Sequence, residues 1–146
     1  MTVLSSIAAL LFSVFLLIGG NALVGVTTPL RGHIERFSDL TVGLLGSAYF
    51  AGMLAGTLAA PAVIRRGGHI RAFAAFVAMA IVSVILMPVI VSPWAWLLFR
   101  ALTGFVFAGI YAVIEAWINA KATNSNAARS MRSTRSRISA LRRAGR

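Results

Sequence analysis

Four long apolar runs, separated by short polar segments, occupy most of the first 120 residues of the chain. They cover about residues 3–28, 40–64, 70–91 and 94–119. Each reaches the roughly 20 apolar residues that a helix needs to cross a bilayer. None shows the alternation of a barrel strand, and a helix satisfies its own backbone hydrogen bonds inside lipid. The pattern therefore predicts an all-α membrane protein with four transmembrane helices.

A secretory signal peptide is the alternative interpretation of the first run. Signal peptides begin with a basic segment and carry a short apolar core before a cleavage site of small residues. The first run lacks the basic segment, and its apolar core is too long. A membrane-spanning helix is therefore the favoured prediction for residues 3–28.

The composition agrees with a membrane protein and argues against an enzyme. The chain is 59% hydrophobic and 12% charged, with a mean hydropathy of +0.87, outside the range of soluble domains. It has no cysteine, which excludes disulfides, thiol catalysis and thiolate metal sites. It also lacks a Ser/His/Asp set, an HExxH motif and a phosphate-binding loop. We expect no enzymatic activity, no cofactor and no metal.

Cationic residues between the second and third runs predict the orientation in the membrane. The turn contains Arg65, Arg66 and Arg71, whereas the segment 31–39 mixes both signs and the segment 92–93 has no charge. Cationic loops stay in the cytoplasm. We therefore predict that both termini are cytoplasmic.

The three tryptophans fit this orientation, because indoles are favoured at membrane–water interfaces. Trp94 and Trp96 start the fourth run, and Trp117 lies near its end. The prediction is that Trp94 and Trp96 lie at the outer interface and Trp117 at the inner one.

Small residues at helical spacing predict close helix packing. Gly52 and Gly56 form a GxxxG step, and Gly104, Ala108 and Ala112 share one face of the fourth run. Helices in lipid associate through such faces, where their backbones can approach. We interpret these glycines as helix-packing positions rather than as a ligand site.

Polar residues inside the apolar runs are the candidates for a substrate cavity. Arg100 lies about six residues, or roughly 9 Å, into the fourth run, and Asn21 lies roughly 12 Å below the end of the first. An arginine within the membrane is costly and faces a bundle interior or an aqueous cavity. The two residues share a depth, and with Tyr111 they are our candidates for the cavity. A structural hydrogen-bonding role for Arg100 stays open.

Glu115 is the only acidic residue in the apolar runs. It lies about 22 Å below Arg100 along the fourth run, too far for a direct pair. It is closer to the level of Arg65, Arg66 and Arg71. We favour a structural or gating ion pair with these arginines over a role in proton or substrate binding.

Two segments resemble the major facilitator superfamily of membrane transporters. The segment "GTLAAPAVIRRGGHIRAF" is similar to the family's basic turn between helices two and three, and "RALTGFVFAGIYAVIEAWIN" is similar to its fourth-helix motif, an arginine followed by a glycine. The nearest subgroup is bacterial and poorly characterised. In one departure, Arg65 stands where the family usually has an aspartate. The resemblance implies the first third of a twelve-helix fold in a bacterial inner membrane.

After Lys121 the chain becomes a basic tail, residues 122–146, rich in arginine, serine and alanine. The tail holds seven of the fourteen Lys and Arg residues and no acidic residue, so we expect it to be disordered. A reading-frame shift is the favoured explanation, because a neighbouring frame permits an apolar segment like a fifth helix. A lipid-binding tail is the alternative, and binding to nucleic acid is not expected, since no stacking aromatic residue or folded module is present.

The sequence thus predicts a transporter of a small solute that is truncated and inactive as a lone chain, with the lipid bilayer as its surroundings. Two alternatives remain at this stage. One is a small four-helix transporter that works as an oligomer. The other is a membrane anchor that does not transport and that uses its basic tail on lipid.

Overall fold

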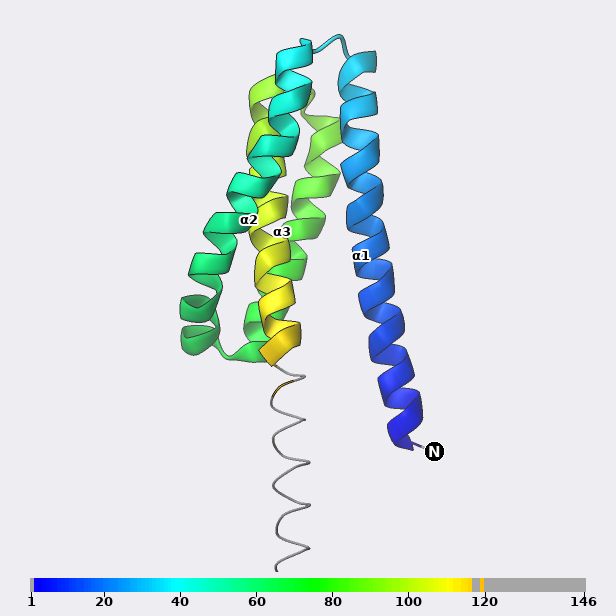
Figure 1. Ribbon diagram of the computed structural model, residues 1–146, viewed down its shortest axis with the longest axis vertical. Helices are drawn as coiled ribbons and strands as arrows, with labels where there is room; N and C mark the ends of the chain where they lie inside the picture. Colours follow the sequence, from blue (N-terminus) through cyan, green and yellow to red (C-terminus); the bar gives the residue numbers. More distant parts are fainter. Residues whose placement is uncertain (1, 117–118, 120–146) are drawn as a thin grey trace, which may run out of the picture.

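The computed structural model describes residues 2–116 and residue 119, and these residues form a bundle of long helices (Figure 1). α1 spans Thr2–Ile34, α2 spans Asp39–Gly67 and α3 spans His69–Val89. A fourth helix covers Pro93–Ala116. All four are long and apolar enough to cross a membrane. The predicted all-α fold with four membrane-spanning helices is confirmed.

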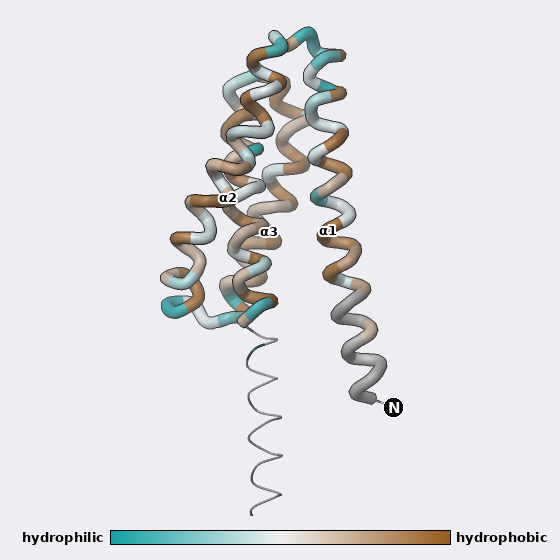
Figure 2. The backbone as a smooth tube through the Cα atoms, viewed as in Figure 1, coloured by the Kyte–Doolittle hydropathy of each residue, from teal (hydrophilic) through white to brown (hydrophobic). Residues whose placement is uncertain are grey.

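Successive helices run in opposite directions, so the connecting segments alternate between the two ends of the bundle. The α1–α2 loop and the connection from α3 to the fourth helix lie at one end (Figure 1). The α2–α3 turn lies at the other end, where α1 begins. Hydrophilic residues gather mainly at these two ends, with hydrophobic residues between them (Figure 2). This distribution is what a bilayer-spanning bundle requires.

α1 continues past residue 28, where the apolar run was expected to end, as far as Ile34. The added turn is stabilised by an (i, i+4) ion pair, in which Arg31 Nη2 and Glu35 Oε1 lie 2.6 Å apart. Arg31 and His33 also place basic groups in the last turn, where they complement the helix dipole. Residues read as loop from their polarity are therefore helical.

Two local features define the ends of α2. Ser38 caps its start, since the Ser38 Oγ accepts a hydrogen bond from the Thr41 N–H at 3.2 Å. At its other end Gly68 has φ of 73°, a left-handed conformation that glycine adopts at little cost. Its N–H donates to the Ile64 carbonyl at 2.8 Å. The chain can therefore reverse into α3 within one residue.

The fourth helix is the most buried of the four, and α1 is the least buried. In Figure 1 the fourth helix, in yellow, lies between α2 and α3. Its inward side forms the main core with α3. The buried members of this core are Ala72, Phe76, Ala80, Val106, Phe107, Ile110 and Val113.

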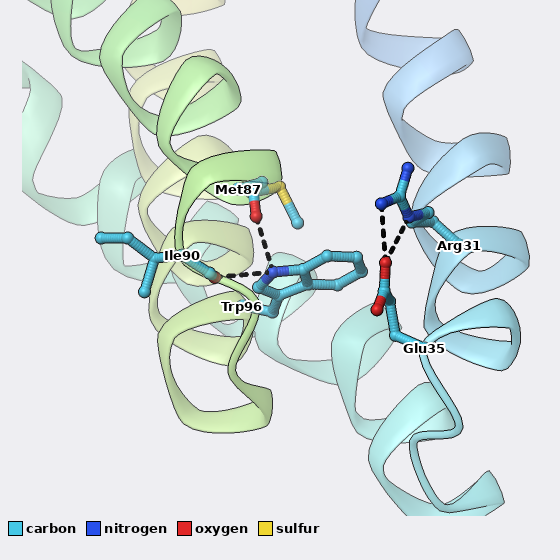
Figure 3. A network of polar contacts seen from close by, with 5 residues as sticks. All are labelled: Arg31, Glu35, Met87, Ile90 and Trp96. Carbon is cyan, nitrogen blue, oxygen red and sulfur yellow. Dashed lines mark hydrogen bonds and ion pairs between the residues drawn. The ribbon is translucent and has the colours of Figure 1, made fainter.

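Trp96 is buried against neighbouring side chains, with 2% exposed, and its expected place at the outer membrane interface stays a prediction. Its indole N–H donates to the carbonyls of Met87 at 2.8 Å and Ile90 at 3.0 Å (Figure 3). Met87 lies in the last turn of α3 and Ile90 is its C-cap, and the Ile90 carbonyl also accepts from the Ser92 N–H at 3.0 Å. The Trp96 ring also packs edge-on against the Phe37 ring, with 5.1 Å between the ring centroids. By contrast, Trp94 is 81% exposed, whereas Trp117 lies outside the described residues.

Candidate functional site

Arg100 is the charged residue at the centre of the candidate site. It lies seven residues into the fourth helix, which corresponds to a depth of about 10 Å. Its side chain is buried, with 6% exposed. The guanidinium carbon lies 4.6 Å from the centre of the Tyr49 ring, a cation–π geometry that disperses part of the charge.

Tyr49 connects Arg100 to α1. The Asn21 Nδ2 of α1 donates a hydrogen bond to the Tyr49 hydroxyl at 2.9 Å. Tyr111, on the fourth helix, lies close to Asn21 and Tyr49. The structure thus gathers the three cavity candidates, Asn21, Arg100 and Tyr111, around Tyr49. Asn21 and Arg100 were expected to meet at one depth, and they are joined through the tyrosine rather than directly.

Tyr49 is the site residue that sequence reasoning missed. It lies in the apolar stretch "GSAYFAGM", where a lone tyrosine is typical of ordinary core packing. The available signal was its spacing from the small residues, because Tyr49 comes three residues before Gly52. A residue at that spacing lies near the same helix face.

The close contact between α2 and the fourth helix positions Tyr49 beside Arg100. A Cβ added to Gly52 would lie 2.6 Å from the Ala101 carbonyl carbon, and one added to Gly56 would lie 2.8 Å from the Phe105 Cα. From the other side, a Cβ on Gly104 would lie 2.9 Å from the carbonyl carbon of Tyr49. The three predicted packing glycines therefore face a neighbouring backbone directly.

No acidic side chain among the described residues balances the charge of Arg100. Among the described residues its Nε and Nη1 have no hydrogen-bond partner, although both are buried. The sequence has three acidic residues. Glu35 pairs with Arg31, and Asp39 is 98% exposed in the turn that starts α2. Glu115 lies fifteen residues further along the same helix as Arg100, about 22 Å away.

Glu115 does not form the ion pair that we expected from the sequence. It is exposed, as are Arg65, Arg66 and Arg71. Within the described part of the chain, Arg31 forms an ion pair with Glu35, and the His33 Nδ1 lies 3.9 Å from the Asp39 Oδ1. The expectation was wrong for this pairing because similar depth alone does not bring side chains together. A gating role for these four residues stays a prediction.

A crevice of about 320 Å³ opens between α1 and α3, next to the polar cluster. Asn21 belongs to both the crevice and the cluster. The remaining lining is apolar or glycine: Leu16, Leu17, Gly20, Val24, Val77, Ala80, Ile81, Val84, Ile85 and Phe107. The volume is at the small end of the range for small-molecule sites.

Comparison with known proteins agrees with this arrangement. Residues 4–134 match the family described as "Sugar (and other) transporter", which is part of the major facilitator superfamily. The chain belongs to this family of transporters. The resemblance inferred from the basic turn and the fourth-helix motif is thereby confirmed, and the chain is a multi-pass membrane protein. The family match runs past Lys121 into the basic tail, which lies outside the described residues.

Curated relatives from Escherichia coli are similar over most of the chain. The uncharacterised MFS-type transporter YcaD of strain S88 is 32% identical over 122 residues, which cover 82% of this chain and 31% of the relative. The YcaD proteins of strains ED1a and 536 give the same values. The chain therefore spans about a third of the length of these relatives. No solved structure matches the chain.

Proposed function

We propose that this chain supplies the first four helices of a transporter that moves a small solute across a bacterial inner membrane. The observation that carries the proposal is the buried guanidinium of Arg100, whose Nε and Nη1 have no hydrogen-bond partner in the part of the chain that the structure describes. An intramembrane charge of this kind is costly, and it is typical of substrate pathways. Family membership supplies the reaction class, and the polar cluster around Tyr49 supplies a place for a solute.

The lone chain is not expected to transport. Transporters of this superfamily place the solute between two halves, and access alternates by the movement of one half against the other. The chain spans 31% of its YcaD relatives, and its four helices leave α1 largely uncovered. We therefore propose that the chain transports solute only as part of a larger helical assembly and that it does not transport alone.

Both termini are proposed to be cytoplasmic, which makes the turn with Arg65, Arg66 and Arg71 cytoplasmic as well. Because the chain has no cysteine, single cysteines report the orientation directly. In intact cells, a cysteine at Gly67 should resist a membrane-impermeant maleimide, whereas one at Ser38 should react. The reverse pattern would show that the orientation is inverted. Opening the cells should expose both sites and serves as the control.

Transport itself is tested by uptake into proteoliposomes. This chain, tagged, is expressed with the part of E. coli YcaD that it does not cover, and the purified pair is compared with the lone chain over a panel of labelled small solutes. We expect saturable uptake by the pair and none by the lone chain. In the pair, Arg100→Gln should lower the initial rate about tenfold or more, as expected when a charged contact of 1.5–3 kcal/mol is lost.

Arg36→Gln is the matched control, because it removes the same charge from an exposed position in the α1–α2 loop. Its uptake should equal that of the wild type. Failure of the two parts to copurify would contradict the claim that these helices form the first third of the fold. Uptake by the lone chain would instead support the small oligomeric transporter.

A further inference from the structure

The cluster around Arg100 has more hydrogen-bond donors than acceptors. A guanidinium offers five N–H donors and no acceptor, and the buried Nε and Nη1 of Arg100 find no partner among the described residues. The Tyr49 hydroxyl already accepts from Asn21, so its proton remains to be donated. All three acidic side chains of the chain lie elsewhere. The complement of such a site is an anion.

The face of the fourth helix that carries Arg100 leads into the apolar crevice. Phe107 and Tyr111 follow Arg100 by seven and eleven residues, which places them about 20° to either side of Arg100 around the helix axis. Phe107 lines the crevice, and its ring lies 6.1 Å from that of Tyr111. A ligand on this face therefore meets a cation at one level and an apolar surface at the next.

We propose that the site binds a monocarboxylate with an apolar chain. The carboxylate lies against the guanidinium of Arg100 near the Tyr49 hydroxyl, and the chain lies in the crevice between α1 and α3. A carboxylate matches the planar guanidinium, and such charge-assisted hydrogen bonds are about twice as strong as neutral ones. The crevice, about 320 Å³ in volume, selects a short chain. This inference rests on the proposed function and names the class of solute.

Binding is measured on the detergent-solubilised chain by the change in its tryptophan fluorescence and thermal midpoint. The probes are acetate, butyrate, hexanoate and octanoate, each compared with the matching neutral amide at equal ionic strength. We expect each carboxylate to bind more tightly than its amide. Affinity should rise about fourfold for each added CH₂ until the crevice is full. The amides report any effect of the alkyl chain on the detergent micelle.

Two variants separate the two parts of the site. Arg100→Gln should abolish the preference for carboxylate over amide, a loss of about tenfold or more, whereas Arg36→Gln should keep it. Gly20 lines the crevice, and a Cβ added there meets nothing within 4 Å. Gly20→Leu should therefore fold normally, weaken octanoate binding and leave acetate unchanged.

Equal binding of acids and amides would overturn the proposal, as would a preference that survives in Arg100→Gln. Octanoate binding that is unchanged in Gly20→Leu would overturn the assignment of the chain to the crevice. These measurements require no transport. Carboxylate binding with no uptake by the assembled pair would contradict the proposed function alone, and uptake restricted to neutral solutes would contradict this inference alone.

Discussion

Adding one methyl group at Gly52 should disrupt the pairing of α2 with the fourth helix. In Gly52→Ala the new Cβ would lie 2.6 Å from the Ala101 carbonyl carbon and 2.8 Å from the Ala101 Cα. The obstacle is backbone, so no side-chain rotation can relieve it. The helices must separate along the line that holds Tyr49 beside Arg100. Overpacking of this kind typically costs 1–3 kcal/mol, and we expect a loss of about 3 kcal/mol.

The measurement is the unfolding of the purified protein in detergent, followed by circular dichroism. Gly46→Ala is the matched control, because Gly46 lies in the same helix and a Cβ there meets nothing within 4 Å. It should be neutral or slightly stabilising, since alanine favours a helix over glycine by about 1 kcal/mol. Equal stability of Gly52→Ala and the wild type would refute the close contact between the two helices.

The number and type of the helices followed from the sequence because the bilayer imposes them. A run of about 20 apolar residues has one stable form inside lipid. The end of α1 did not follow, since the Arg31–Glu35 ion pair extends the helix beyond the apolar run. The same limit applies to Trp96. Its indole is held by hydrogen bonds to the carbonyls of Met87 and Ile90, and hydropathy does not reveal these contacts.

The sequence predicted only part of the candidate site. Asn21 and Arg100 are polar residues in apolar runs, so they are conspicuous whatever the helices pack against. Tyr49 belongs to the site only because α2 packs with that side chain directed toward the fourth helix. The expected pairing of Glu115 with the arginines was wrong for the same reason. The sequence gives the depth of a residue along its helix, but it does not give the direction in which the side chain points. Contacts between helices therefore required the structure.

The unbalanced charge of Arg100 should make the lone chain less stable than it could be. A charged residue in the membrane interior costs about 2.5–3.5 kcal/mol on insertion scales. The contact with the Tyr49 ring, at 4.6 Å, returns about 1–2 kcal/mol. Among residues 2–116 and 119, no carboxylate pairs with Arg100 to offset the remaining cost. Proteins accept such costs where function requires the group, so removing the charge should raise stability and remove binding together.

Arg100→Met is the variant that tests this balance, because methionine is unbranched, apolar and adaptable in packing. We expect its free energy of unfolding in detergent to exceed that of the wild type by about 0.5–2.5 kcal/mol, the difference between the insertion cost and the cation–π term above. Arg36→Met, at an exposed loop position, should change stability by less than about 0.5 kcal/mol. A less stable Arg100→Met would mean that the guanidinium is already balanced inside the four-helix unit. Hexanoate should reduce the difference in the free energy of unfolding between Arg100→Met and the wild type, because only the wild type offers the hexanoate carboxylate a cation.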